Sequence, residues 1–155
     1  MNMTANGLKC LKSWEGLRTK LYVDACGKLT IGYGHRVYPK DLTLFKDGID
    51  LPTAERYLKI DVTAVIHGIK VIEGKIPAGS CTDTIISFVF NIGVPAFLNS
   101  TLFRDIMSGN LADIPAQLMR WVHDDHGNVI DGLKHRRQEE IALWKEGLQE
   151  AGIRK

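Results

Sequence analysis

The sequence lacks the features that mark disulfide-rich secreted domains and membrane proteins. Its three cysteines are an odd number without framework spacing, which favours free thiols and synthesis in a reducing compartment. The N-terminal residues contain no apolar signal segment, and no run approaches the roughly 20 apolar residues that span a bilayer. We therefore expect neither an export signal nor a stable membrane anchor in these residues.

The sequence also lacks a large excess of one charge, because the formal net charge is only +2. A balance this mild does not indicate a nucleic-acid partner. Basic residues nevertheless gather near both ends of the chain, and if they meet in space they favour an anionic polymer. The alternative is an ordinary solvated face. The residues are Lys9, Lys12, Arg18, Lys20 and Lys28 early, and Lys134, Arg136, Arg137, Arg154 and Lys155 late.

The composition is that of a globular protein that buries a core. Hydrophobic residues make up 45% of the 155 and charged residues 25%, which fits one domain or two small lobes. Internal repeats and low-complexity segments are absent from the sequence. The simplest expectation is a monomer.

The first part of the chain predicts a helix followed by a β-hairpin. Thr4 is a plausible N-cap of the helix, and Gly16 is a plausible stop. Residues 21–34 then show the apolar alternation of strands. A three-residue loop would place Asp24 opposite Lys28, with Asp24 and Thr30 on one face of the hairpin. A two-residue turn would instead place Asp24 opposite Leu29.

The rest of the chain predicts mostly helix. Residues 35–52 look like a loop that contains a short third strand, and Thr53 can cap a long amphipathic helix. We expect an α+β fold with two lobes. Its parts are a small N-terminal β-hairpin lobe at about 13–53, a long connecting helix at about 54–72, and an all-helical C-terminal lobe at about 73–155, packed with helix 4–15.

Two carboxylates and a hydroxyl near the hairpin suit the hydrolysis of a glycosidic bond. Glu15 ends an apolar helix face, where lost hydration and the helix dipole favour its neutral form, as a general acid requires. Asp24 beside a turn should stay ionised and deprotonate a water that Thr30 helps to hold. Room for that water predicts inversion at the anomeric carbon. The structural alternative is a surface acid, a turn former and an ordinary strand residue.

Three ordered segments resemble the phage-type lysozymes, glycoside hydrolase family 24. The segments are "WEGLRTKLYVDACGKLTIGYGH", "FNIGVPAFLNSTL" and "GLKHRRQEEIALW". The resemblance implies a two-lobed lysozyme-like fold and a muramidase that cleaves the β-1,4 bond between N-acetylmuramic acid and N-acetylglucosamine in peptidoglycan. It also implies Glu15, Asp24 and Thr30 as the catalytic positions, with no metal or other cofactor.

The resemblance further implies a phage endolysin made in the host cytoplasm. Such an enzyme needs a holin-type membrane permeabiliser to reach the cell wall in the periplasm. The alternatives are a tail-associated or bacteriocin-like muramidase, a transglycosylase that leaves anhydro ends, and a peptidoglycan-binding module without catalysis.

Other residues are candidates either for substrate binding or for structural roles. Phe90, Asn91 and Ser100 lie in the matched segments and are candidates for substrate binding, although Phe90 also suits a core and Ser100 a helix cap. Arg136 and Arg137 could steady Glu15 or bind anionic peptide stems, or pair with Glu139 or Glu140 along their own helix.

The remaining polar residues are expected to be structural or unreactive. His123, Asp124, Asp125 and His126 resemble a metal site but lack a fixed helical spacing, and His35 is expected to be a hydrogen-bonded structural residue. Cys26 departs from the commonest family residue. We expect it to be a free thiol that alkylating reagents can reach, rather than the redox switch of some relatives.

Overall fold

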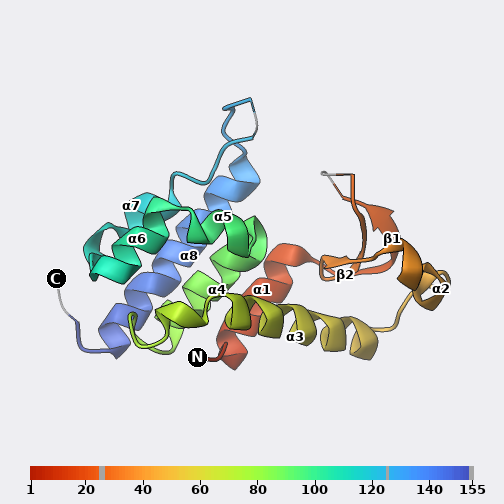
Figure 1. The fold of residues 1–155 in the computed structure, drawn as a ribbon, viewed down its shortest axis with the longest axis horizontal. Coiled ribbons are helices and arrows are strands. Elements are labelled where there is room, and N and C mark those ends of the chain that lie inside the picture. Colours follow the sequence, from red (N-terminus) through yellow and green to blue (C-terminus); the bar gives the residue numbers. More distant parts are fainter. Residues whose placement is uncertain (25–26, 125, 154–155) are drawn as a thin grey trace. The chain divides into compact units, whose positions relative to one another are not determined.

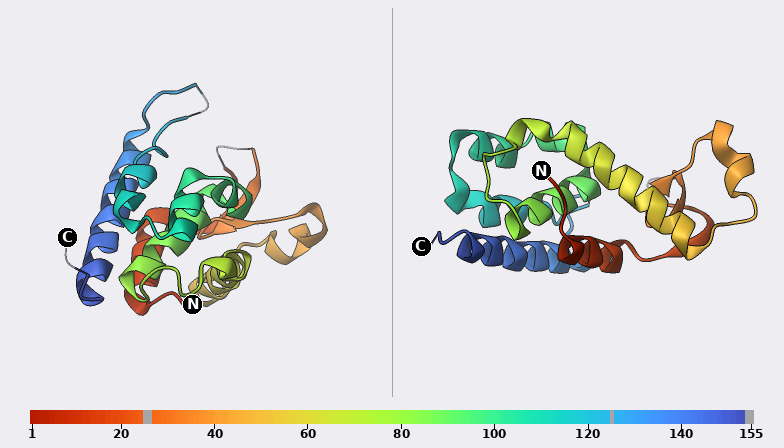
Figure 2. Two further views of the ribbon diagram at one scale, coloured as in Figure 1. Left: turned by 60° about the vertical axis from the view of Figure 1, so that its left-hand side comes forward. Right: turned by 90° about the horizontal axis from the view of Figure 1, so that it is seen from below.

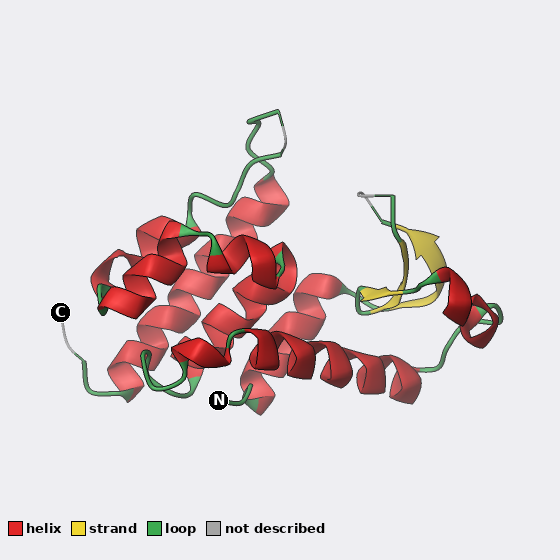
Figure 3. Cartoon of the chain, in the orientation of Figure 1, coloured by secondary structure: helices red, strands yellow, loops and turns green. Residues whose placement is uncertain are grey.

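The computed structural model describes residues 1–24, 27–124 and 126–153. The chain divides into two compact units. We call Lys9–Ala64 the sheet unit, and Met1–Leu8 together with Val65–Lys155 the helical unit. Helices dominate and the strands form one small sheet (Figure 1, Figure 3), so the α+β prediction is confirmed. None of the helices within the described residues combines the length and apolarity needed to cross a membrane.

Helix α1 spans Ala5–Glu15 and is capped as the sequence predicts. The Thr4 hydroxyl accepts a hydrogen bond from the Gly7 amide at 3.0 Å and donates one to Asp83. The Thr4 amide donates to Asp83 Oδ1 at 2.8 Å. A Cβ atom at position 7 would lie 2.3 Å from the Asp83 Cγ atom, so only glycine fits there. Asp83 therefore fixes the first turn of α1 inside the helical unit.

The sheet unit contains a three-stranded antiparallel sheet. The strands are β1 (Arg18–Val23), β2 (Leu29–Gly32) and β3 (His35–Arg36), in that order across the sheet. Val23 pairs with Leu29 and Tyr22 with Thr30, so the register continues to Asp24 opposite Lys28. The Asp24 amide donates to the Lys28 carbonyl oxygen at 2.8 Å. The three-residue-loop register is confirmed, and the two-residue alternative is wrong.

One face of this sheet forms the core of the sheet unit. Ile31, Val37 and Phe45 are buried there, with Leu21, Leu29, Ile49 and Tyr57 packed against them. Phe45 comes from α2 (Leu42–Phe45), which follows the 3-10 turn η1 (Pro39–Asp41) in the region expected to be loop. The predicted short third strand in this region is β3.

His35 is a structural residue, as expected. Its Nδ1 lies 2.9 Å from Asp61 Oδ2, and its ring lies 4.4 Å from the ring of Tyr57. This contact ties strand β3 to the long helix α3 (Leu51–Gly68) within the sheet unit.

Helix α3 begins and ends earlier than the prediction of about 54–72. Asp50, rather than Thr53, caps it: Asp50 Oδ1 accepts from the Thr53 amide at 2.9 Å. Pro52 lies in the first turn, where a missing amide hydrogen has no cost, so the helix can start at Leu51. After Gly68 the chain continues as a 3-10 turn, η2 (Lys70–Ile72).

The cap predicts a clear difference between two alanine substitutions. Asp50→Ala should lower the free energy of unfolding by about 1 kcal/mol, because the Thr53 amide loses its acceptor. Thr53→Ala leaves that acceptor in place and should change stability by less than about 0.5 kcal/mol. Urea denaturation of both variants measures this. A larger loss for Thr53→Ala would show that the assignment of the cap is wrong.

The helical unit is built around α4 (Ser80–Ile92), whose residues Ser80–Val89 are all buried. Gly93 ends α4, and Pro95 lies in the first turn of α5 (Val94–Leu98). Helices α6 (Thr101–Ser108) and α7 (Ile114–Leu118) follow, separated by the 3-10 turn η3 (Leu111–Asp113).

The last helix, α8 (Asp131–Glu150), packs along α4 and contacts α7 (Figure 2). The approach to α4 is close, because a Cβ atom at Gly147 would lie 2.4 Å from the Cys81 amide nitrogen.

Candidate active site

Asp24 and Thr30 lie on the face of the sheet opposite the core. Side chains alternate along a strand, so Leu21, Leu29 and Ile31 enter the core while Tyr22, Asp24 and Thr30 share the other face. The Lys28 backbone links the two candidate residues. Its amide donates to Asp24 Oδ1 at 2.7 Å, and its carbonyl oxygen accepts from the Thr30 hydroxyl at 3.0 Å.

These hydrogen bonds limit the donors and acceptors that Thr30 and Asp24 can offer to a further partner. The Thr30 hydroxyl uses its only hydrogen on Lys28, so toward any further partner it acts as an acceptor. Thr30 is only 3% exposed, whereas Asp24 is half-buried. A water beside both groups could donate one hydrogen to the threonine oxygen and the other to a carboxylate.

Glu15 is the last residue of α1 and lies beside the same sheet. A Cβ atom at Gly34, in the turn between β2 and β3, would be 3.5 Å from Glu15 Oε2. Gly34 has φ +85°, which favours glycine, and its missing side chain leaves this approach open. The Glu15 side chain is half-buried. Glu15, Asp24 and Thr30 therefore all belong to the sheet unit and lie around strand β2.

The sequence reasoning did not identify Tyr22 and Arg18 as site residues. Tyr22 stands directly opposite Thr30, and the Arg18 guanidinium lies over its ring, 4.8 Å from the centroid. Burial raises the pKa of Tyr22, the charges of Glu15 and Asp24 raise it further, and Arg18 partly opposes the rise. The spacing of Tyr22 and Asp24 could have identified Tyr22 from the sequence. Residues two positions apart on a strand lie on the same face.

The three candidate substrate-binding residues belong to the helical unit. Phe90 is half-buried and Asn91 is exposed near the end of α4. Ser100 is buried and caps α6: its hydroxyl accepts from the Phe103 amide at 3.1 Å and donates to the Phe97 carbonyl oxygen at 2.6 Å. The structure thus gives Ser100 the capping contacts that the sequence offered as its structural alternative.

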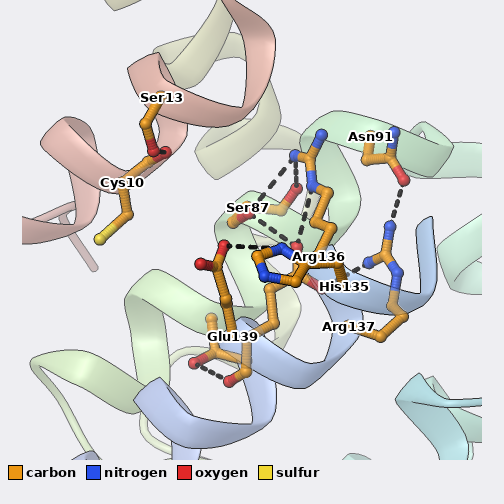
Figure 4. Close-up of polar contacts among 10 residues, drawn as sticks. Cys10, Ser13, Ser87, Asn91, His135, Arg136, Arg137 and Glu139 are labelled. Atoms are coloured by element: carbon orange, nitrogen blue, oxygen red, sulfur yellow. Dashed lines mark hydrogen bonds and ion pairs between the residues drawn. The ribbon is translucent and has the colours of Figure 1, made fainter. Parts of the chain in front are cut away.

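Arg136 and Arg137 take part in a buried ionic network rather than in a solvated face. Glu140 on the same helix accepts from Arg136 Nε at 3.2 Å, from Arg137 Nη1, and from the Ser87 hydroxyl at 2.8 Å. Arg137 also donates to Asn91, and Figure 4 shows the two arginines reaching toward α4. Burial raises the pKa of Glu140, and the guanidiniums of Arg137 and Arg136 oppose that rise.

The other polar candidates have structural contacts or lie outside the described residues. Asp124 Oδ1 accepts from the amides of His126 and Asn128, so it shapes the loop before α8. Within residues 1–24, 27–124 and 126–153 no cluster of three or more metal-binding side chains occurs. Four of the residues considered in the sequence lie outside the described residues: Cys26, Asp125, Arg154 and Lys155. The expectation that Cys26 is an accessible thiol therefore stays a prediction. Cys81 is a buried free thiol, and burial raises its pKa to about 12.

Known structures share this fold. A crystal structure of P22 lysozyme matches with a TM-score of 0.76 at 29% identity, covering 94% of this chain and 99% of that one. The muramidase domain of SpmX from Asticaccaulis excentricus also matches, with a TM-score of 0.76 at 24% identity and 92% and 97% coverage. The fold is therefore that of a lysozyme.

Sequence comparison identifies the family. The model described as phage lysozyme matches residues 12–140. The endolysin of Acyrthosiphon pisum secondary endosymbiont phage 1 is 34% identical, covering 94% of this chain and 99% of the relative. The endolysin of Bacillus phage B103 is also 34% identical over 95% of this chain, which spans about half (55%) of that relative's length. The chain belongs to the phage lysozyme family.

Proposed function

We propose that this chain is a peptidoglycan muramidase that hydrolyses the β-1,4 bond from N-acetylmuramic acid to N-acetylglucosamine, with inversion. The observation that carries the proposal is the grouping of Glu15, Asp24 and Thr30 around strand β2 in one unit of the chain. Membership of the phage lysozyme family supports the substrate class.

Glu15 would be the general acid. It is the last residue of α1, and its side chain is half-buried. A protonated carboxyl there can deliver its proton to the leaving glycosidic oxygen. The adjacent Gly34 carries no side chain that would keep a saccharide away from the carboxyl group.

Asp24 would be the general base. The Lys28 amide donates to Asp24 Oδ1 and so orients the carboxylate. A water that donates one hydrogen to Thr30 Oγ1 and one to Asp24 would have a lone pair left for the anomeric carbon. Attack by this water from the side opposite the leaving oxygen inverts the configuration.

The proposed biological role is that of a phage endolysin that opens the host wall. The enzyme would be made in the host cytoplasm, act as a monomer, and reach the wall in the periplasm after a holin-type protein permeabilises the inner membrane. Phe90, Asn91 and Ser100 of the helical unit are proposed to contribute to glycan binding, and Ser100 also caps α6.

Product analysis tests this function. Purified peptidoglycan is digested and the soluble fragments are identified by mass spectrometry. The proposal predicts fragments with reducing N-acetylmuramic acid ends that carry the added mass of water. Reducing N-acetylglucosamine ends would place the cut at the other glycosidic bond, and anhydro ends would indicate a transglycosylase. Intact glycan chains would contradict the proposed function altogether.

A further inference from the structure

We infer that Tyr22 is a substrate-binding residue whose hydroxyl donates a hydrogen bond to the saccharide beside Glu15 and Asp24, and that Arg18 fixes its ring. The inference rests on the proposed glycan hydrolysis but adds a residue and a contact to it. It explains why a half-buried phenol shares one face of the sheet with Asp24 and Thr30.

The position of Tyr22 follows from the register of the sheet. It pairs directly with Thr30, and directly opposed residues have Cβ atoms about 4.5–5.5 Å apart. It also precedes Asp24 by two residues, so both side chains leave the same face of β1. A ligand that contacts both Asp24 and Thr30 therefore meets the Tyr22 ring.

The hydroxyl of Tyr22 is available to such a ligand. Within residues 1–24, 27–124 and 126–153 no group forms a hydrogen bond with it. A tyrosine hydroxyl is protonated in the neutral range, and burial raises the pKa of Tyr22 further, so the hydroxyl can donate. A glycan brings hydroxyl, ether and acetamido oxygens that need donors, whereas the carboxylates of Glu15 and Asp24 can only accept when ionised.

Arg18 restricts the orientation of the ring. Its guanidinium lies 4.8 Å from the ring centroid, within the range of a cation–π contact. The pairing of β1 with β2 is irregular between Arg18 and Tyr22, and this irregularity accompanies the placement of the Arg18 side chain against the same ring. A ring held in this way loses less conformational freedom when a saccharide binds.

A matched control exists in the same unit. Tyr57 on α3 is also half-buried, and the Arg56 guanidinium lies 5.1 Å from its ring centroid. Its ring packs against Phe45 and His35 in the core instead of facing the candidate site. Tyr57→Phe and Arg56→Gln therefore remove the same groups without touching the proposed contact.

The test measures glycan binding in a chain that cannot cleave. Glu15→Gln and the double variant with Tyr22→Phe are titrated with soluble chains of alternating N-acetylglucosamine and N-acetylmuramic acid by calorimetry. Loss of one hydrogen bond should weaken binding about tenfold. Arg18→Gln should weaken binding severalfold, and Tyr57→Phe should leave it unchanged. With native Glu15, Tyr22→Phe should lower kcat/KM about tenfold, while its melting temperature stays within about 3 °C of the parent.

The proposed hydrolysis and the assignment of Tyr22 can fail separately. If the native chain does not cleave glycans, the proposed hydrolysis is wrong. If the native chain cleaves but Tyr22→Phe binds glycan as tightly as its parent, the assignment of Tyr22 is wrong and the function stands. A loss of stability in Tyr22→Phe well beyond that in Tyr57→Phe would also overturn the assignment, because it would give the hydroxyl a structural role.

Discussion

Glu15→Gln is expected to slow the clearing of chloroform-treated Gram-negative cells by about 10³-fold or more. Glutamine has nearly the shape of glutamate and can still occupy the end of α1 beside Gly34. It has no proton to give to the leaving oxygen, and a positioned general acid contributes about 10²–10⁴-fold to such reactions. Turbidity recorded over time on the same suspension measures the effect.

A matched control and two contradicting outcomes belong to this experiment. Glu146→Gln removes an exposed acid of α8 and should clear cells at the native rate. If Glu15→Gln clears as fast as the native chain, Glu15 is not the general acid. If the native chain binds peptidoglycan and clears nothing, it is a binding module, and the catalytic reading of the site is wrong.

Glu140→Ala should lower the free energy of unfolding by about 3–5 kcal/mol. Glu140 is fully buried, and it accepts hydrogen bonds from two arginines and a serine. Without its carboxylate, Arg136 and Arg137 would lose the buried acceptor that their guanidinium groups share. For a chain of this size the loss corresponds to a fall in melting temperature of roughly 10 °C, measurable by calorimetry.

The neighbouring residue offers a matched control for this prediction. Glu139 is exposed, and its carboxylate lies 3.9 Å from His135 Nδ1 on the same helix. Exposed ion pairs contribute little, so Glu139→Ala should cost less than about 1 kcal/mol. Equal losses in the two variants would mean that the buried network contributes no more than a surface pair.

Local patterns in the sequence predicted the elements that carry the candidate site. The strand alternation on both sides of Asp24 predicted the hairpin but left two registers open, which differ in whether Asp24 and Thr30 share a face. The structure has the register in which Asp24 lies opposite Lys28. Thr4 and Gly16 marked the ends of α1 for equally local reasons, since one can cap an amide and the other adopts a positive φ.

The features that the sequence reasoning missed depend on choices between similar residues or on distant contacts. Asp50 and Thr53 are both good caps, and only the structure shows that the carboxylate of Asp50 reaches the Thr53 amide. The burial of Arg136 and Arg137 depends on Ser87 and Asn91, about 50 positions earlier on another helix. Helical spacing alone indicated the pairing with Glu140 but not that the network is buried.

The configuration of the first product tests the central claim most directly. The account requires that a water held by Asp24 and Thr30 attacks the sugar from the side opposite the oxygen protonated by Glu15. Proton NMR of glycan chains during the first minutes of digestion should therefore show the new N-acetylmuramic acid ends as the α anomer. Initial release of the β anomer, or of anhydro ends, would contradict direct attack by this water.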